Sequence, residues 1–170
     1  IEAGAADEQS LTLYAIGRIV IWTLRPDLDL ANLASIVRSP LVRRFAIANP
    51  EHAPYGLAAR QALEASGLWT EVRPRLVLGE NISQAAQFVQ TGNADTGIVA
   101  MSLVLAPALD GQGRWMEIPA DMHAPLEQGA VLTTRGMANP AARRYLEFLR
   151  SPAARAIFER YGFRLPAVTP

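Results

Sequence analysis

The chain has 170 residues, of which 50% are hydrophobic and 19% charged, the profile of a globular domain of medium size. Its 16 basic residues, all arginine, balance 16 acidic ones, so composition indicates no electrostatic surface for nucleic acid. The absence of cysteine excludes disulfides and thiolate metal sites. No apolar run is long enough for a membrane span, and the first residues do not resemble a signal peptide.

Hydrophobic periodicity and turn residues predict strands that alternate with helices along the chain. Strands are predicted over residues 11–24, 43–49, 75–79, 96–101, 113–119 and 127–134. Helices are predicted over residues 30–38, 54–67, 81–92, 139–149 and 152–161. Gly17 is expected to bend the first strand, and Asp29 is expected to cap the first helix.

The strands near residues 45, 76 and 97 are apolar on both faces. A strand of this kind is covered on both sides, whereas a half-exposed strand alternates apolar and polar residues. The sequence therefore predicts an α/β fold, with a sheet flanked by helices on both faces.

Two joins between a strand and the following helix are candidates for a ligand site, one from Ala48 to Tyr55 and one from Gly79 to Ile82. Open α/β sheets bind ligands outside the carboxyl ends of their strands. A helix N-terminus has unpaired N–H groups and the positive end of the helix dipole, and both attract anions. Two converging N-termini would hold an oxyanion without lysine or arginine. The alternative is that these are ordinary joins, which every doubly wound protein contains.

Other chemistry has little support in the sequence. His52 and His123 share no spacing typical of metal ligands. No Gly-x-Ser-x-Gly motif marks a hydrolase nucleophile, and no nucleophile is paired with a base. We therefore expect no enzyme activity, no metal centre and no cofactor.

Several segments together resemble the second part of the periplasmic molybdate-binding proteins, the solute receptors of an ABC transporter for molybdate and tungstate. They are "FAIANPEHAPYGLAARQAL" (45–63), "GENISQAAQFVQTGNADTGIVAMS" (79–102), "PLEQGAVL" (125–132) and "AARRYLEFLRSPAARAIFERYGFRLP" (141–166). The stretch "LYAIGRIVIW" (13–22) is similar to the strand that enters the second domain of that family. The resemblance runs in order over nearly all of residues 11–166.

This resemblance implies the type II periplasmic-binding-protein fold, an α/β fold whose mixed sheet is flanked by helices on both faces. Residues 11–132 would form the second α/β domain, and residues 133–170 would supply C-terminal helices to the first. The first domain would be incomplete, because only ten residues precede the segment that matches at residue 11.

The resemblance also implies a site. In the family, neutral donors hold the oxyanion in a cleft between two domains, and by position two of them are the backbone N–H groups of Tyr55 and Ile82. Pro54 would pre-set the helix start, and Gly56 would let the anion approach the backbone. The residues expected to shape the site are Pro54, Gly56, Asn81 and Ser83. Some relatives have a tyrosine donor where this chain has Ala100.

The implied function is a periplasmic receptor that binds molybdate or tungstate and delivers it to an ABC permease, with no nucleic-acid partner. An alternative is the effector-sensing module of a transcription regulator with the same fold. If the first domain is incomplete, the apolar face of the C-terminal helices needs another cover, and self-association is expected. The residues of that face are Tyr145, Phe148, Leu149, Ile157 and Phe158.

Overall fold

The computed structural model describes residues 4–167, which form two compact units. The sheet unit is the continuous segment Arg18–Leu126, and the helical-pair unit combines residues 4–17 with 127–167. The sheet unit is shorter at both ends than the domain expected over residues 11–132, because the segments flanking it pair with each other in a separate small sheet. The division of the whole protein into domains stays a prediction.

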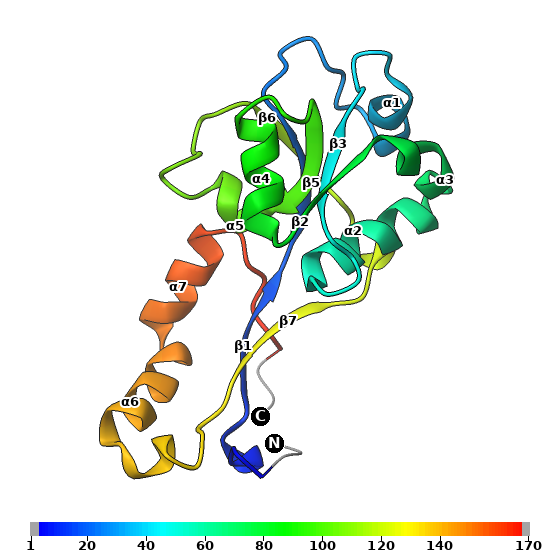
Figure 1. Cartoon of the computed structure of the whole chain (residues 1–170). Coiled ribbons are helices and arrows are strands. Elements are labelled where there is room, and N and C mark those ends of the chain that lie inside the picture. Colours follow the sequence, from blue (N-terminus) through cyan, green and yellow to red (C-terminus); the bar gives the residue numbers. More distant parts are fainter. Residues whose placement is uncertain (1–3, 168–170) are drawn as a thin grey trace. The chain divides into compact units, whose positions relative to one another are not determined.

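The sheet unit is built on a mixed five-stranded sheet with the order β4-β3-β5-β2-β6 (Figure 1). The strands are β2 (Ile19–Thr23), β3 (Phe45–Ala48), β4 (Leu76–Gly79), β5 (Thr96–Ala100) and β6 (Arg114–Glu117). β3 is parallel to both β4 and β5. β2 is antiparallel to both β5 and β6. The predicted fold class, a mixed sheet within an α/β fold, is confirmed.

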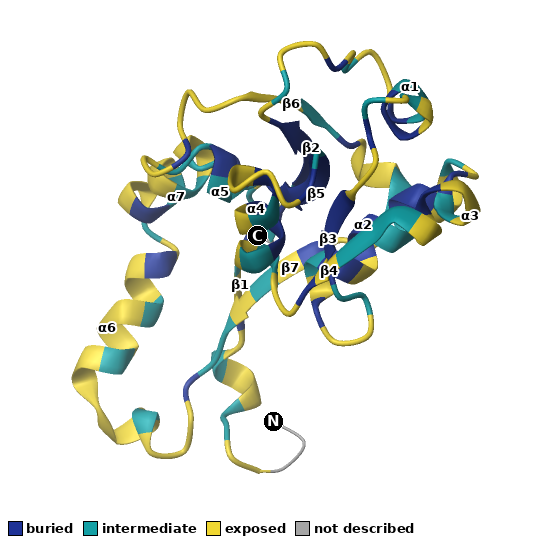
Figure 2. Ribbon diagram, turned by 45° about the horizontal axis from the view of Figure 1, so that its top comes forward, coloured by how far each residue is buried: buried dark blue, intermediate teal, exposed yellow. Residues whose placement is uncertain are grey.

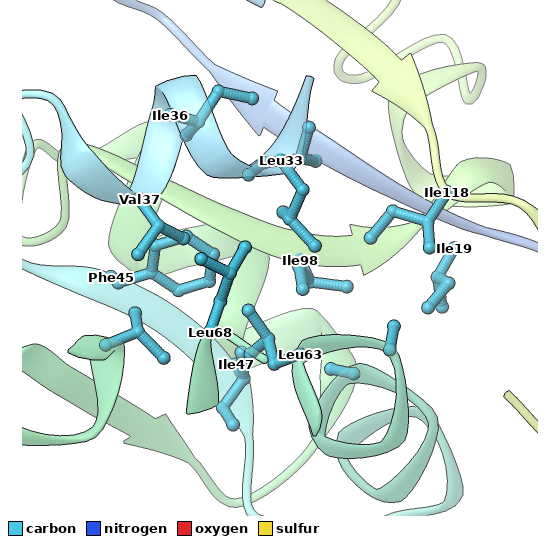
Figure 3. Packing of buried hydrophobic residues seen from close by; sticks show 14 of the residues in the cluster. Ile19, Leu33, Ile36, Val37, Phe45, Ile47, Leu63, Leu68, Ile98 and Ile118 are labelled. Carbon is cyan, nitrogen blue, oxygen red and sulfur yellow. The ribbon is translucent and has the colours of Figure 1, made fainter. Parts of the chain in front are cut away.

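Helices cover both faces of this sheet, and the alternation of side chains along β3 shows why. Phe45 and Ile47 point to the core that contains the buried residues of α2, whereas Ala46 points to the core against α4. Figure 3 shows Phe45 and Ile47 packed with Leu63 and other side chains of the first core. Burial of each such large side chain stabilises the fold by roughly 1.5–3 kcal/mol. The helices are α1 (Leu33–Arg38), α2 (Pro54–Ala65), α3 (Trp69–Val72), α4 (Ile82–Gln90) and α5 (Met101–Val104).

The first helix starts later than predicted, and Asp29 is not its cap. The N-cap is Asn32, whose Oδ1 accepts from the Ser35 N–H at 2.8 Å, while the Ser35 hydroxyl accepts from the Asn32 N–H at 3.3 Å. Asp29 instead accepts from the Ala31 N–H at 3.0 Å and closes a tight turn. Both side chains are good helix caps, and the reciprocal bond with Ser35 is available only to Asn32.

Replacing Asn32 by alanine should therefore destabilise the protein by about 1 kcal/mol, because the first turn of α1 loses its side-chain acceptor. Replacing Asp29 by alanine should have a smaller effect, since it removes a local turn bond that caps no helix. Urea denaturation of both variants measures the two changes. A larger loss for the Asp29 variant would contradict this assignment of the cap.

The predicted strand over residues 11–24 is two strands. β1 (Thr12–Gly17) pairs with β7 (Leu126–Ala130), and only β2 enters the large sheet. The break falls between Gly17 and Ile19, next to the expected bend. Arg18, at the break, donates from Nε to Glu117 Oε1 at 2.8 Å, which ties the start of β2 to the end of β6. The prediction of one continuous strand was wrong, because its first half pairs with β7 and only its second half joins the large sheet.

The helical-pair unit contains β1, most of β7 and two helices, α6 (Pro140–Leu149) and α7 (Pro152–Arg160). Asn139 and Ser151 cap these helices. Much of α6 is exposed, as Figure 2 shows. Single-turn 3-10 helices complete the secondary structure at Glu8–Ser10, Arg73–Arg75, Ala120–Met122 and Gly136–Ala138. None of the helices within residues 4–167 has the length and apolar character needed to cross a membrane.

Candidate functional site

The two joins singled out in the sequence lie next to each other at one edge of the large sheet. β3 and β4 are neighbouring parallel strands, and their register pairs Ala48 with Gly79 at the carboxyl ends. Residues 49–53 connect β3 to α2, and residues 80–81 connect β4 to α4. Both helices therefore begin beyond the edge of the sheet at which open α/β sheets bind ligands.

The first turn of α2 has no side-chain cap. Its N-cap, Ala53, offers no side-chain acceptor, and the first helical hydrogen bond runs from the Leu57 N–H to the Ala53 carbonyl at 3.0 Å. Pro54 occupies the first helical position, where its missing N–H costs nothing and its fixed φ suits the helix. Tyr55 and Gly56 follow, so their backbone N–H groups belong to the positive end of the helix dipole.

Gly56 has a packing role that the sequence analysis did not predict. The sequence suggested that its missing side chain lets a ligand approach the backbone. In the structure Gly56 is buried, and a Cβ atom built on it would lie 2.2 Å from the Ala48 carbonyl oxygen and 2.8 Å from the Asn49 carbonyl carbon. The glycine thus lets the start of α2 pack directly against the end of β3. The approach of a ligand to the Gly56 backbone stays a prediction.

The first turn of α4 is capped by Asn81 and still leaves donors available. Asn81 Oδ1 accepts from the Gln84 N–H at 3.0 Å, and Gln84 Oε1 accepts from the Glu80 N–H at 2.6 Å. Within residues 4–167, the N–H groups of Ile82 and Ser83 make no hydrogen bond. Asn81 therefore serves its own helix, and the two following N–H groups are free to bind a ligand.

Hydrogen bonds tie the two joins together. The Asn49 N–H donates to the Gly79 carbonyl at 2.7 Å, directly beyond the ends of β3 and β4. Closer to the helix starts, Nε2 of His52 lies 3.1 Å from the Glu80 carbonyl oxygen and 3.4 Å from Glu80 Oε2. No role for His52 was predicted from the sequence. The sequence shows that His52 lies directly before the start of α2, but it does not show that His52 bonds to Glu80 in the other join.

No arginine side chain bonds to the two helix starts in the described part of the chain. The nearest along the sequence, Arg60, is engaged by Glu64 at 2.8 Å and by Glu51 at 3.8 Å. The hydrogen bond to Glu64 raises the pKa of Arg60 above its ordinary value, and the attraction of Glu64 and Glu51 adds to the rise. Among the described residues, the donors that the two turns offer to an anion are backbone N–H groups, and the exposed Glu80 carboxylate nearby is an opposing charge.

Ala100 lies at the carboxyl end of β5, the strand on the other side of β3. It is 2% exposed and forms the N-cap of α5, to which its side chain contributes no hydrogen bond. A methyl group at this position cannot donate to a ligand. The described residues also contain no cluster of His, Asp or Glu suited to a metal ion. Nδ1 of His123 lies 2.8 Å from the carbonyl oxygen of the next residue, Ala124.

Helix starts at adjacent strand ends occur in many α/β folds, so this geometry alone does not define a family. The chain belongs to the family described as bacterial extracellular solute-binding proteins, whose model matches residues 1–164. The transcription regulator considered as an alternative is not favoured by this assignment.

Two curated relatives and one solved structure to which the chain is similar are molybdate-binding proteins. The chain is 39% identical over 153 residues to the molybdate-binding protein ModA of Azotobacter vinelandii, covering 89% of this chain and 60% of that protein. It is 38% identical over 163 residues to ModA of Rhodobacter capsulatus, covering 96% of this chain and 63% of that protein. The solved structure of the periplasmic molybdate-binding protein of Azotobacter vinelandii superposes with a TM-score of 0.87 at 32% identity, covering 97% of this chain and 72% of that one. The chain thus spans 60% and 63% of the length of these two curated relatives.

Proposed function

We propose that the chain is part of a receptor that binds molybdate or tungstate and passes it to an ABC permease. The observation that carries this proposal is the pair of helix starts, α2 and α4, placed side by side at the ends of β3 and β4. The named function of the relatives from Azotobacter vinelandii and Rhodobacter capsulatus supports the choice of ligand.

In this proposal the ligand oxygens accept hydrogen bonds from the backbone N–H groups of Tyr55 and Ile82. Pro54, Gly56, Asn81 and Ser83 hold these donors in place. Neutral dipoles suit a transport receptor, because the anion must be bound tightly and later released. Selection among tetrahedral anions then depends on the size of the site and the direction of its donors, not on net charge.

The same comparison supports proposals for the activity, location and partners of the receptor. Its relatives carry the names of binding proteins, so we propose a binding role without catalysis and without a cofactor. The family description and the periplasmic relative support a location outside the cytoplasm, which we take to be the periplasm. The proposed partners are the oxyanion and a membrane permease, and nucleic acid is not among them.

Molybdate and tungstate should raise the melting temperature of the full-length protein, because a ligand that binds only the folded state stabilises it by mass action. At a ligand concentration one hundred times Kd the gain is about 2.7 kcal/mol. Differential scanning fluorimetry at constant ionic strength measures the shift. Sulfate and phosphate should produce a much smaller one, and equal shifts for all four anions would remove the proposal.

We also propose that the 170-residue chain associates with itself when it is isolated. Tyr145, Phe148 and Ile157 of α6 and α7 are 62%, 44% and 45% exposed. The expected apolar face is partly covered, however, since Leu149 is buried and Phe158 packs 5.2 Å from the ring of Tyr14. Light scattering at rising concentration should show dimers, and replacing Tyr145 and Ile157 by glutamate should reduce them. A monomer at every concentration would contradict this.

A further inference from the structure

The two helix starts are joined by a side chain that the proposed binding mode does not use. Nε2 of His52 lies 3.1 Å from the main-chain oxygen of Glu80. A carbonyl oxygen only accepts, so this ring nitrogen carries the hydrogen. His52 directly precedes Ala53, the N-cap of α2, and Glu80 directly precedes Asn81, the N-cap of α4. The bond therefore connects the two turns at the points where their helices begin.

We propose that His52 is a positioning residue that sets the distance between the two anion-binding turns. The inference rests on the proposed function and assigns a specific task within it. In the described part of the chain, residues 49–53 and 79–81 share two hydrogen bonds, the backbone bond between Asn49 and Gly79 and the bond made by His52. The backbone bond fixes the joins where the strands end. The His52 bond is the tie nearer to the helix starts.

This distance matters because one small anion has to accept from both turns at once. A tie present before binding reduces the ordering that the ligand must impose, and preorganisation of this kind raises affinity. It also fixes the spacing that suits one size of tetrahedral anion. Without the tie the two turns can move apart or together, so the site adapts to smaller anions and discriminates less between molybdate and sulfate.

The test compares His52→Ala with His52→Gln in the full-length protein. Alanine removes the donor, and we expect molybdate to bind roughly three- to tenfold more weakly in calorimetry, the effect of one ordinary hydrogen bond. The amide nitrogen of glutamine stands as many bonds from Cα as Nε2 of histidine, so glutamine can donate to the same carbonyl and should restore affinity.

Two controls separate this effect from others. His123→Ala removes the other histidine, whose ring bonds to the carbonyl of Ala124 outside the two joins, and should leave molybdate affinity unchanged. Glu80→Gln keeps the main-chain acceptor and removes the carboxylate, so affinity should stay the same or rise slightly. A loss with Glu80→Gln as large as that with His52→Ala would show that the ion pair, not the hydrogen bond to the carbonyl, acts here, and would overturn the proposal.

Amide hydrogen exchange without any anion tests the tie independently of the ligand. The Ala53 N–H donates to the Asn49 carbonyl at 2.9 Å within the first join, and its exchange should be at least threefold faster in His52→Ala than in the wild type or His52→Gln. Equal exchange in all three proteins would overturn the role of His52. Failure of the wild type to bind molybdate would instead refute the proposed function, while the exchange rates still decide whether the tie exists.

Discussion

Replacing Gly56 by alanine should destabilise the protein by about 3 kcal/mol, the upper part of the range for overpacking in a close-packed interior. The added Cβ would lie 2.2 Å from the Ala48 oxygen, 2.7 Å from the Ala48 carbonyl carbon and 2.8 Å from the Asn49 carbonyl carbon. All three atoms belong to the backbone, so no side chain can rotate away. Either α2 or the end of β3 must move.

The melting temperature should fall by roughly 6–12 °C, since 1 kcal/mol corresponds to about 2–4 °C in a protein of this size. Valine, with its branched side chain, should be worse than alanine. Gly129→Ala is the matched control, because its Cβ would have Leu13 Cδ2 as its nearest neighbour at 3.4 Å, an ordinary contact. Comparable losses for the two alanine variants would show that α2 does not pack on β3 in the way described.

Replacing Ile82 by proline should weaken molybdate binding by roughly ten- to a hundredfold. The change deletes one N–H that would donate to the anion, and a hydrogen bond to a charged group contributes about 1.5–3 kcal/mol. The fold should tolerate it, because Ile82 is the first residue of α4 and its N–H makes no bond within the described residues. Asn81 before it is already extended, with φ −149° and ψ 174°, as a residue preceding proline must be.

The control for this variant is Ile82→Ala, which keeps the N–H and loses more of the side chain that packs on the core under α4. Calorimetry should find alanine close to the wild type in affinity. Tyr55→Phe should also bind normally, because it changes a hydroxyl and leaves the backbone intact. Strong binding by Ile82→Pro together with weak binding by Tyr55→Phe would show that a side-chain hydroxyl holds the ligand.

Much of the fold could be predicted because local signals agree with tertiary packing. Pro54 at the start of α2 and Gly67, with φ +70°, just beyond its end fix that helix from sequence alone. The predictions failed where the sequence is compatible with two different local structures. Asp29 and Asn32 are both good caps, and only the partner Ser35 decides between them. The segment over residues 11–24 has strand propensity throughout, and propensity does not tell which strand pairs with which.

Prediction of the candidate site from the sequence was limited in the same way. The two joins were visible because strands that are apolar on both faces lead into helices with proline or asparagine at their starts. At Gly56 the missing Cβ indicates a close neighbour, and the structure identifies one as the Ala48 carbonyl, while the approach of a ligand stays a prediction. The pairing of His52 with Glu80 joins residues 28 apart in sequence, and no local pattern encodes it.

The central claim is that backbone N–H groups at the starts of α2 and α4 hold the oxyanion, and it can be measured directly by NMR. Protein labelled with ¹⁵N at tyrosine and isoleucine reports the amides of Tyr55 and Ile82 among few others. On titration with molybdate these two amide protons should move together and saturate at one concentration, while sulfate at the same concentration moves them far less. Saturable binding of molybdate that leaves both amides unmoved would contradict the account.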